Sequence, residues 1–153
     1  MIYQKIIKTP IGDICILEEN NKIIGLTLDN EKYCYTEKNT EILNETEKQL
    51  NEYFWGKRKK FNVPINPKGT EFQKQVWNEL LKIPYGQTVT YKRIAQKIEK
   101  PNAARTVGMA NHNNPIAIIV PCHRVVGSNS KLVGYAFGLE RKQFLLDLEN
   151  KFK

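Results

Sequence analysis

Residues 116–124 read IAIIVPCHR, an apolar run followed by a proline, a cysteine, a histidine and an arginine. The five apolar residues 116–120 predict a short buried strand. Cys122 follows this strand and has His123 and Arg124 as its next neighbours. The thiolate is the nucleophilic form of cysteine, and a nearby base or positive charge makes it available near neutral pH. We therefore expect Cys122 to be a reactive nucleophile.

The whole chain has the composition of a globular protein of one or two small domains. Its 153 residues are 41% hydrophobic and 26% charged, and they include no apolar run long enough for a membrane span. The first residues show no signal-peptide pattern. Three cysteines without paired spacing argue against a disulfide scaffold and predict a reducing compartment, which we take to be the cytoplasm. Two histidines without CxxC or HxxxH spacing predict no metal site.

Positive charge is concentrated in the second half of the chain. Residues 71–153 carry 13 Lys and Arg against 6 Asp and Glu, a balance of +7, whereas residues 1–70 carry 11 against 10, a balance of +1. A localised basic field around a candidate nucleophile suggests a polyanionic partner, most simply nucleic acid. A solvated surface that keeps the protein soluble explains the same charge, and the charge alone does not separate the two explanations.

The first half of the chain predicts β hairpins followed by a helix. Turn sequences at residues 9–12 and 19–22 separate apolar stretches, and the alternating apolar residues of 24–28 predict a half-buried strand. Apolar residues at helical spacing predict a helix over residues 41–55, and residues 61–63 predict one more strand.

A linker follows these elements. Residues 64–69 contain two prolines and a glycine, and the charge balance changes there. We therefore place a domain boundary near residues 65–69, which gives domains of residues 1–66 and 67–153.

The second half predicts short helices. Thr70 and Gln73 form a capping box for a helix that runs to about Lys82. Thr90 is placed to cap a helix over residues 91–98, and further helices are expected over residues 103–111 and about 139–150. Two short helices joined by a tight turn in a basic region predict a helix-turn-helix, although an ordinary pair of antiparallel helices has the same pattern.

The helix over residues 103–111 has two different faces. Val107 belongs to the inward face, whereas Arg105 and Met109 lie four residues apart on the outward face, with Gly108 beside them. Small residues let a helix backbone approach a duplex closely, and proteins that extrude a base often fill the gap with a side chain. Arg105 is either such an intercalating residue or one more surface cation.

Glu149 occupies an unusual position for a carboxylate. On the helical wheel it falls on the apolar side, between Leu145 and Leu146. It lies either in solvent at a frayed helix end or in a buried pair, for which His123 is the natural partner. Adjacent residues of a strand point to opposite sides, so a bridging water or an irregular backbone must connect Cys122 to His123.

These residues closely resemble a known family, the O6-alkylguanine-DNA alkyltransferases or methylated-DNA–protein-cysteine methyltransferases. The resemblance rests first on PCHRV at residues 121–125, on Asn114-Pro115 before it, and on Gly134-Tyr135 and Gly138-Leu139 after it. It extends over residues 70–150 through Tyr91, residues 103–105 (AAR), Val107-Gly108 and Glu149. The family resemblance implies an α+β fold. A ribonuclease H-like α/β domain precedes a C-terminal winged-helix or helix-turn-helix-like domain that carries the active site.

The resemblance also implies a reaction that each molecule performs once. Cys122 accepts the alkyl group from O6 of guanine in DNA and forms a stable thioether, and O4 of methylated thymine is a second candidate donor. His123, held by Glu149, deprotonates Cys122 through a water molecule. Tyr91 donates to guanine N3 so that the base leaves neutral, and Asn114 holds the turn before the active site. Neither a metal nor a cofactor is implied.

The same resemblance assigns the contacts with double-stranded DNA, which the family binds through the minor groove, and it implies a monomer. Arg105 replaces the extruded base. The other residues assigned to DNA contact are Thr90, Ala103, Ala104, Gly108 and Met109. The residues assigned to the base pocket are Val125, Tyr135, Ala136 and Phe137. Phe137 is a bulky residue at a variable position of the family, and we expect it to disfavour large alkyl groups such as benzyl.

Two other functions fit parts of the pattern. One is a non-catalytic sensor or regulator of alkylated DNA on the same scaffold, which the presence of Cys122 disfavours. The other is a thiol hydrolase with a Cys122–His123 dyad, for which the sequence names no oxyanion site.

Overall fold

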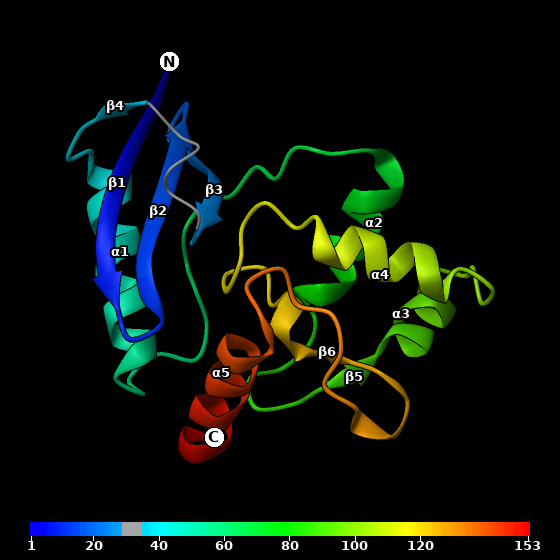
Figure 1. Cartoon of the computed structure of the whole chain (residues 1–153). Coiled ribbons are helices and arrows are strands. Elements are labelled where there is room, and N and C mark those ends of the chain that lie inside the picture. Colours follow the sequence, from blue (N-terminus) through cyan, green and yellow to red (C-terminus); the bar gives the residue numbers. More distant parts are fainter. Residues whose placement is uncertain (29–34) are drawn as a thin grey trace. The chain divides into compact units, whose positions relative to one another are not determined.

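The structure is a computed structural model that describes residues 1–28 and 35–153. The chain divides into two compact units, Met1–Lys68 and Gly69–Lys153 (Figure 1). Of the two cysteines to which the sequence assigns no role, Cys15 is buried as a free thiol, and Cys34 lies outside the described residues.

The N-terminal unit contains a four-stranded sheet in the order β3-β2-β1-β4. Its strands are β1 (Ile2–Thr9), β2 (Gly12–Glu19), β3 (Lys22–Thr27) and β4 (Thr36–Glu37). The first three are antiparallel neighbours, and β4 runs parallel to β1. Both predicted hairpin turns are confirmed. Asn20 and Asn21 adopt φ values of 53° and 62°, the left-handed conformation that a tight two-residue hairpin turn requires.

Two details of this unit differ from the sequence prediction. In β3 the fully buried isoleucine is Ile23 rather than Ile24, because the register shifts where Leu17 pairs with Gly25 and Glu18 with Ile23, which leaves Ile24 as the extra residue of a bulge. Residues 61–63 do not form a strand. The Asn62 N–H donates to the Gln49 side chain at 2.8 Å, so this backbone group has a hydrogen-bond partner without pairing with another strand.

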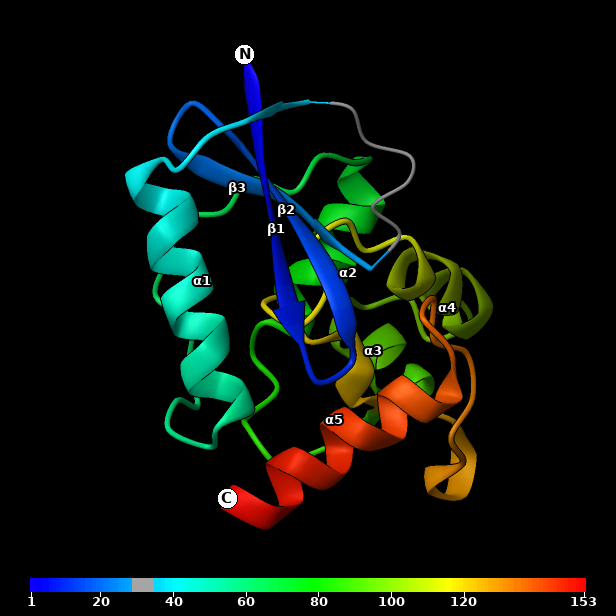
Figure 2. The ribbon, with the colours of Figure 1, turned by 60° about the vertical axis from the view of Figure 1, so that its left-hand side comes forward.

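Helix α1 (Glu41–Phe54) lies along one face of this sheet (Figure 2). Thr40 caps its N-terminus by accepting a hydrogen bond from the Leu43 N–H, and the buried face includes Leu43, Leu50 and Tyr53. The helix predicted over residues 41–55 is therefore confirmed.

The C-terminal unit is built mainly from helices. They are α2 (Glu71–Leu80), α3 (Tyr91–Lys97), α4 (Ala104–His112) and α5 (Leu139–Phe152). The Thr70–Gln73 capping box and the Thr90 cap are both formed. The Trp77 indole N–H donates to the Ala110 carbonyl at 2.8 Å and joins α2 to α4. A parallel pair of short strands, β5 (Val89–Thr90) and β6 (Val125–Val126), brings the residues after Cys122 beside the start of α3.

The strand predicted over residues 116–120 is wrong, although the prediction that these residues are buried is right. The segment forms a buried turn in which the Val120 N–H donates to the Ile116 carbonyl at 3.0 Å. Ile118 has a φ of 71°, an unfavourable conformation for a β-branched residue and one that cannot continue a strand. The chain then enters a single 3₁₀ turn, η2 (Cys122–Arg124), before β6 begins.

Candidate active site

Cys122 is the first residue of η2, and its side chain is 3% exposed. Two asparagines from the end of α4 and the following turn fix the backbone around it. The Asn114 side chain donates to the carbonyls of Val120 at 2.8 Å and Ile116 at 3.3 Å, and its oxygen accepts from the Ile116 N–H at 3.0 Å. The Asn111 amide donates to the Cys122 carbonyl at 3.3 Å. Side-chain hydrogen bonds therefore take the place of the strand pairing that the sequence predicted.

The resting thiol of Cys122 is not activated in the way that its neighbours in sequence suggest. Burial raises the pKa of Cys122 to about 11, against a usual value of 9.0. The hydrogen bond from Asn114 and the positive charge of Lys142 act in the opposite direction but are outweighed. Cys122 is therefore protonated at neutral pH, and a base must remove its proton before it reacts.

His123, Arg124 and Glu149 form a buried cluster behind Cys122. His123 Nε2 lies 2.6 Å from Glu149 Oε2. Arg124 donates to both oxygens of the same carboxylate, at 2.8 Å from Nε and 3.0 Å from Nη2, and the Gly86 N–H donates at 3.1 Å. Glu149 is only 1% exposed, so of the two positions open to it from the sequence, the structure has the buried pair.

The charges of this cluster determine the tautomer of His123. Burial alone would raise the pKa of Glu149, but the hydrogen bonds and charges of His123 and Arg124 outweigh burial and hold that pKa well below its usual range. Burial lowers the pKa of His123. The carboxylate is thus ionised and the imidazole neutral, with Nε2–H donating to Glu149. Nδ1 keeps its lone pair, and no atom of residues 1–28 or 35–153 is hydrogen-bonded to it.

The 3₁₀ turn changes the relation between Cys122 and His123. The two residues do not alternate along a strand, so the objection that they point to opposite sides does not apply. Even so, no hydrogen bond joins the Cys122 thiol to His123 within the described part of the chain. The irregular backbone expected after Pro121 is therefore present. It does not bring the Cys122 thiol into hydrogen-bond contact with the His123 imidazole.

Tyr91 begins α3 and reaches the loop before α5. Its hydroxyl donates to the carbonyls of Val133 at 3.1 Å and Gly134 at 3.3 Å. Burial and the nearby Cys122 raise the pKa of Tyr91, so it remains a hydrogen-bond donor at neutral pH. Gly134 has a φ of 55°, and a Cβ placed there would lie 3.4 Å from the Tyr91 hydroxyl. The contact between Tyr91 and the loop therefore depends on a glycine at residue 134.

The residues assigned to the base pocket lie on or next to the same loop. Tyr135 is buried, and its ring packs edge-on against Phe137 with centroids 5.6 Å apart. The Tyr135 hydroxyl has no hydrogen-bond partner among the described residues. Ala136 is exposed, and Val125 is buried at the start of β6.

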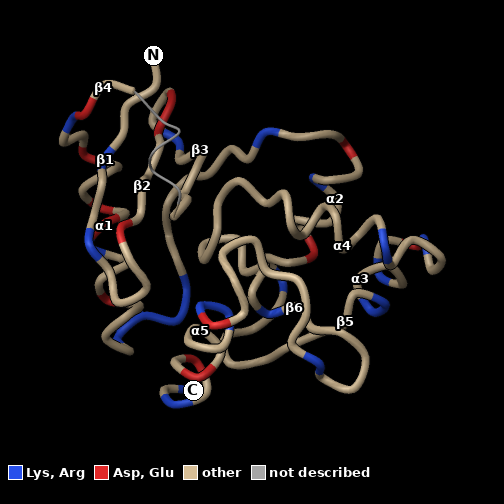
Figure 3. The backbone as a smooth tube through the Cα atoms, in the orientation of Figure 1, with Lys and Arg blue, Asp and Glu red and all other residues tan. Residues whose placement is uncertain are grey.

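The residues assigned to DNA lie on α4 and at the start of α3. Arg105 and Met109 are exposed on the outward face of α4, with Met109 61% exposed, as the helical spacing predicts. Ala103, Ala104 and Gly108 are half-buried. A Cβ on Gly108 would lie 3.8 Å from the Tyr91 ring, so α4 runs close to Tyr91. Thr90 accepts from the Arg93 N–H at 3.1 Å as the cap of α3. Lys and Arg gather around α3 and the start of α4 (Figure 3).

Three side chains of the site have roles that were not predicted from the sequence. Asn111 holds the Cys122 carbonyl, and Arg124 neutralises Glu149. Lys142 is fully buried, and its ammonium group donates to the carbonyls of Val125 and Val133 at 2.6 and 2.8 Å. A signal for Lys142 was present, because it lies seven residues before Glu149 on the same apolar stripe of α5. Lys142, like Glu149, is a charged residue on the apolar side of this helix.

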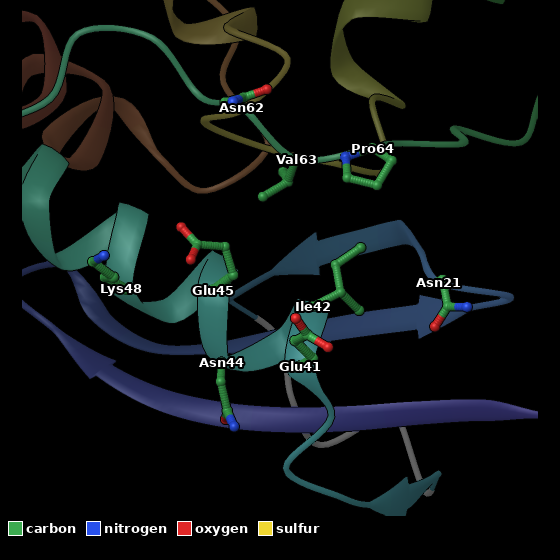
Figure 4. Close-up of a pocket in the computed structure, with 9 residues that line it drawn as sticks. All are labelled: Asn21, Glu41, Ile42, Asn44, Glu45, Lys48, Asn62, Val63 and Pro64. Atoms are coloured by element: carbon green, nitrogen blue, oxygen red, sulfur yellow. The ribbon is translucent and has the colours of Figure 1, made fainter.

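Other features of the described residues lie outside this site. They contain no group of three His, Cys, Asp or Glu side chains that could hold a metal ion. None of the helices that the structure describes is long and apolar enough to cross a membrane. A cavity of about 570 Å³ lies within the N-terminal unit, where Glu41, Glu45 and Lys48 of α1 face residues 62–64 (Figure 4). It contains none of the candidate site residues.

Comparison with known proteins matches both units of the chain to one family. The DNA binding domain of 6-O-methylguanine DNA methyltransferase matches residues 71–151, and the ribonuclease-like domain of the same family matches residues 2–67. A methylated-DNA–protein-cysteine methyltransferase of Methanosarcina acetivorans is 50% identical over 153 residues, covering 97% of this chain and 98% of that protein. The constitutive enzyme of Bacillus subtilis is 45% identical over 158 residues, covering 97% and 96%.

Solved structures agree with these matches. The crystal structure of the Mycobacterium tuberculosis O6-methylguanine methyltransferase has a TM-score of 0.92 and 41% identity, covering 100% of this chain and 95% of that one. A crystal structure of the Mycobacterium tuberculosis protein in complex with DNA has the same TM-score and identity, covering 98% and 94%. The ribonuclease-like unit, the helical DNA-binding unit and the buried cysteine site together show that this chain belongs to the 6-O-methylguanine DNA methyltransferases, the methylated-DNA–protein-cysteine methyltransferases.

Proposed function

We propose that Cys122 is the acceptor in the DNA repair reaction of this family, the transfer of an alkyl group from O6 of guanine in DNA to a protein cysteine. The observation that carries this assignment is the buried arrangement around Cys122. A buried, protonated thiol is followed in the chain by a buried, neutral imidazole, and Glu149 holds that imidazole with Nδ1 unprotonated. Such a histidine is a general base for a neighbouring nucleophile.

The reaction forms one bond and breaks one. The Cys122 sulfur attacks the alkyl carbon, the bond between that carbon and guanine O6 breaks, and a thioether forms. The thiol proton passes to His123 Nδ1 through a bridging water, and the buried Glu149 carboxylate stabilises the resulting imidazolium. With the pKa of Cys122 at about 11, ionisation at neutral pH costs about 5 kcal/mol. His123 and the approach of the substrate must offset that cost.

The leaving guanine needs a proton or a hydrogen bond, and Tyr91 supplies it at N3. In the structure the Tyr91 hydroxyl donates to the Val133 and Gly134 carbonyls. It must exchange these carbonyls for the base. The stable thioether leaves no route back to the free thiol, so each molecule acts once.

The proposal extends to how DNA is bound. Arg105 on the exposed face of α4 enters the base stack when the damaged nucleotide is extruded, and α4 enters the minor groove. Thr90, Ala103, Ala104, Gly108 and Met109 lie along the duplex. The pocket residues Val125, Tyr135, Ala136 and Phe137 receive the base. Residues 67–153 form the catalytic and DNA-binding domain, which acts as a monomer in the cytoplasm, where Cys122 stays reduced.

Intact mass spectrometry tests the assignment. After incubation with duplex DNA that contains O6-methylguanine, the protein should gain the mass of one methylene, stoichiometrically and irreversibly, on the Cys122 peptide. Cys122→Ala should bind the duplex without gaining mass, and Cys15→Ala should react like the native protein. Tight binding of the damaged duplex with no mass gain would instead show a lesion sensor on the same scaffold. A gain on any other residue would refute the role of Cys122.

A further inference from the structure

We propose that Lys142 is a positioning residue for alkyl transfer: its buried ammonium group holds the pocket loop when Tyr91 moves to the base, and it supplies the positive charge against which the Cys122 thiolate forms. This inference rests on the proposed role of Cys122. Lys142 lies on α5, where it is 0% exposed.

The surroundings of Lys142 are unusual for a buried lysine, because they are backbone carbonyls. Its Nζ donates to Val125 O at 2.6 Å, Val133 O at 2.8 Å and Gly134 O at 3.5 Å. None of the ion pairs between described residues includes it. Buried lysines are rare unless they are paired with an anion, so a positive charge kept in this position needs a reason.

Two donors meet on the same carbonyls of the loop. The Tyr91 hydroxyl and the Lys142 ammonium group both donate to the Val133 and Gly134 carbonyls, from α3 and α5 respectively. In the proposed reaction Tyr91 leaves these carbonyls to donate to guanine N3. Lys142 then remains as the side chain that ties the loop before Tyr135 to Val125 of β6. The backbone of the pocket is therefore held while the base is bound.

The charge of Lys142 is also the one uncancelled charge that acts on the thiol within the described residues. The other titratable groups near Cys122 are Tyr91 from α3 and Tyr135 from the loop, and His123 is its neighbour in the chain. All three are neutral at rest, and Arg124 is neutralised by Glu149. The charge of Lys142 lowers the pKa of Cys122, and Cys122 in turn raises that of Lys142, although burial dominates in both and leaves Lys142 at about 8.

Two rates measured on three variants test the inference. The first is alkyl transfer from duplex DNA that contains O6-methylguanine. The second is carbamidomethylation of Cys122 by iodoacetamide at pH 7, where Lys142 is charged, read on the Cys122 peptide; this reaction requires the thiolate but no DNA. Lys142→Met removes the positive charge and the hydrogen-bond donors. Lys142→Arg keeps the positive charge but places it on a planar guanidinium group. Lys151→Met, the control, removes an exposed lysine of the same helix.

We expect Lys142→Met to lower both rates by about tenfold or more, because the thiolate loses its counter-charge. Lys142→Arg should keep the iodoacetamide rate within about threefold of the native value while it loses alkyl transfer, because a guanidinium group does not reproduce the contacts with the three carbonyls. Lys151→Met should match the native protein in both rates.

The opposite results refute the inference. A lysine that only fills space would, when replaced, loosen the loop and leave the iodoacetamide rate unchanged or raise it in both Lys142 variants. Native alkyl transfer by Lys142→Met would exclude the positioning role. Thermal melting identifies the folded variants, and Lys142→Gln, which is neutral but keeps an NH2 donor group, replaces Lys142→Met if the latter does not fold. If neither neutral variant folds, the two rates of the Arg variant are compared: a tenfold loss of its iodoacetamide rate refutes the role of the charge, native rates in both reactions refute the positioning role, and a retained iodoacetamide rate together with a tenfold loss of alkyl transfer supports the inference. Failure of the native protein to take a methyl group from DNA would refute the proposed function, while the iodoacetamide rates would still report on Lys142.

Discussion

Arg124 and Glu149 form a bidentate ion pair inside the C-terminal unit, with Arg124 Nε 2.8 Å from Glu149 Oε1 and Arg124 Nη2 3.0 Å from Glu149 Oε2. The Arg124 Nη1 group also donates to the Ile83 carbonyl at 2.8 Å, and the guanidinium lies 5.7 Å from the centre of the Tyr85 ring. The arginine of the PCHR motif thus fixes the carboxylate that in turn fixes His123. The role of Arg124 is to keep the Glu149 carboxylate ionised and in place next to His123.

Breaking this pair should be costly. Arg124→Met leaves the ionised Glu149 buried without its cation, and removing one partner of a buried ion pair typically costs about 3–5 kcal/mol of unfolding free energy. Urea denaturation at pH 7 measures the loss, with Arg93→Met as an exposed control on α3. A loss below about 1 kcal/mol would contradict the assigned burial and charge of Glu149.

The same variant should unfold at higher pH in acid. The folded-state pKa of Glu149 lies below its usual value of 4.5, so its stabilising contribution is complete above that pH and is lost as the pH falls below it. Without Arg124 the folded-state pKa rises, and the midpoint of acid unfolding should move upward. An unchanged acid midpoint, followed by circular dichroism, would show that Arg124 does not set the ionisation of Glu149.

Cys122 should make the protein less stable in alkali. Its folded-state pKa of about 11 lies above the usual 9.0, so the stability linked to it is complete below pH 9 and is lost as the pH rises toward 11. The loss from this one thiol should be about 1 kcal/mol at pH 10. In Cys122→Ala the fall in unfolding free energy between pH 8 and pH 10 should be smaller by that amount. The cavity left by the substitution lowers the unfolding free energy equally at both pH values, so it does not affect this difference. An equal fall in both proteins would contradict the raised pKa.

Arg105 should matter only when a base has to leave a duplex. Arg105→Ala is expected to slow repair of O6-methylguanine in double-stranded DNA by about tenfold or more, because nothing then fills the gap in the stack. Reaction with free O6-methylguanine should be unchanged. Lys74→Ala, which removes an exposed cation from α2, is the control for a general loss of positive charge. Normal duplex repair by Arg105→Ala would rule out intercalation.

Phe137 should limit the size of the alkyl group. Its ring packs against the buried Tyr135, so replacing it with glycine opens space beside a pocket residue. Phe137→Gly should therefore be inactivated by O6-benzylguanine faster than the native protein, while methyl transfer remains similar. Equal rates of inactivation would show that Phe137 does not narrow the pocket.

Local signals in the sequence predicted most of the helices. The Thr70–Gln73 capping box and the Thr90 cap act over three residues, so they form regardless of the rest of the fold, and both are confirmed. Residues 116–120 show the limit of such reasoning. Their apolar run is buried as expected, but burial does not distinguish a strand from a turn when side chains such as Asn114 supply the hydrogen bonds.

The electrostatics of the site were harder to predict, because they depend on three-dimensional neighbours. Glu149 was singled out from its place on the helical wheel, but its link to Arg124 was not. The activation expected of Cys122 from its adjacent cations was wrong, because Arg124 is directed to Glu149 and burial dominates the thiol. Adjacency in sequence gave the right residues for the site but the wrong pairing of their charges.

The hydrogen bond between the Trp77 indole and the Ala110 carbonyl offers an optical probe of the molecule. Trp77 is buried against α4, the helix that carries Arg105, and the chain's other tryptophan, Trp55, is largely exposed in the N-terminal unit. A protein with Trp55→Phe would retain a single indole whose emission reports on the position of α4. Comparing the tryptophan emission of this variant before and after alkylation of Cys122 would therefore show, without any label, whether α4 keeps its position in the alkylated protein.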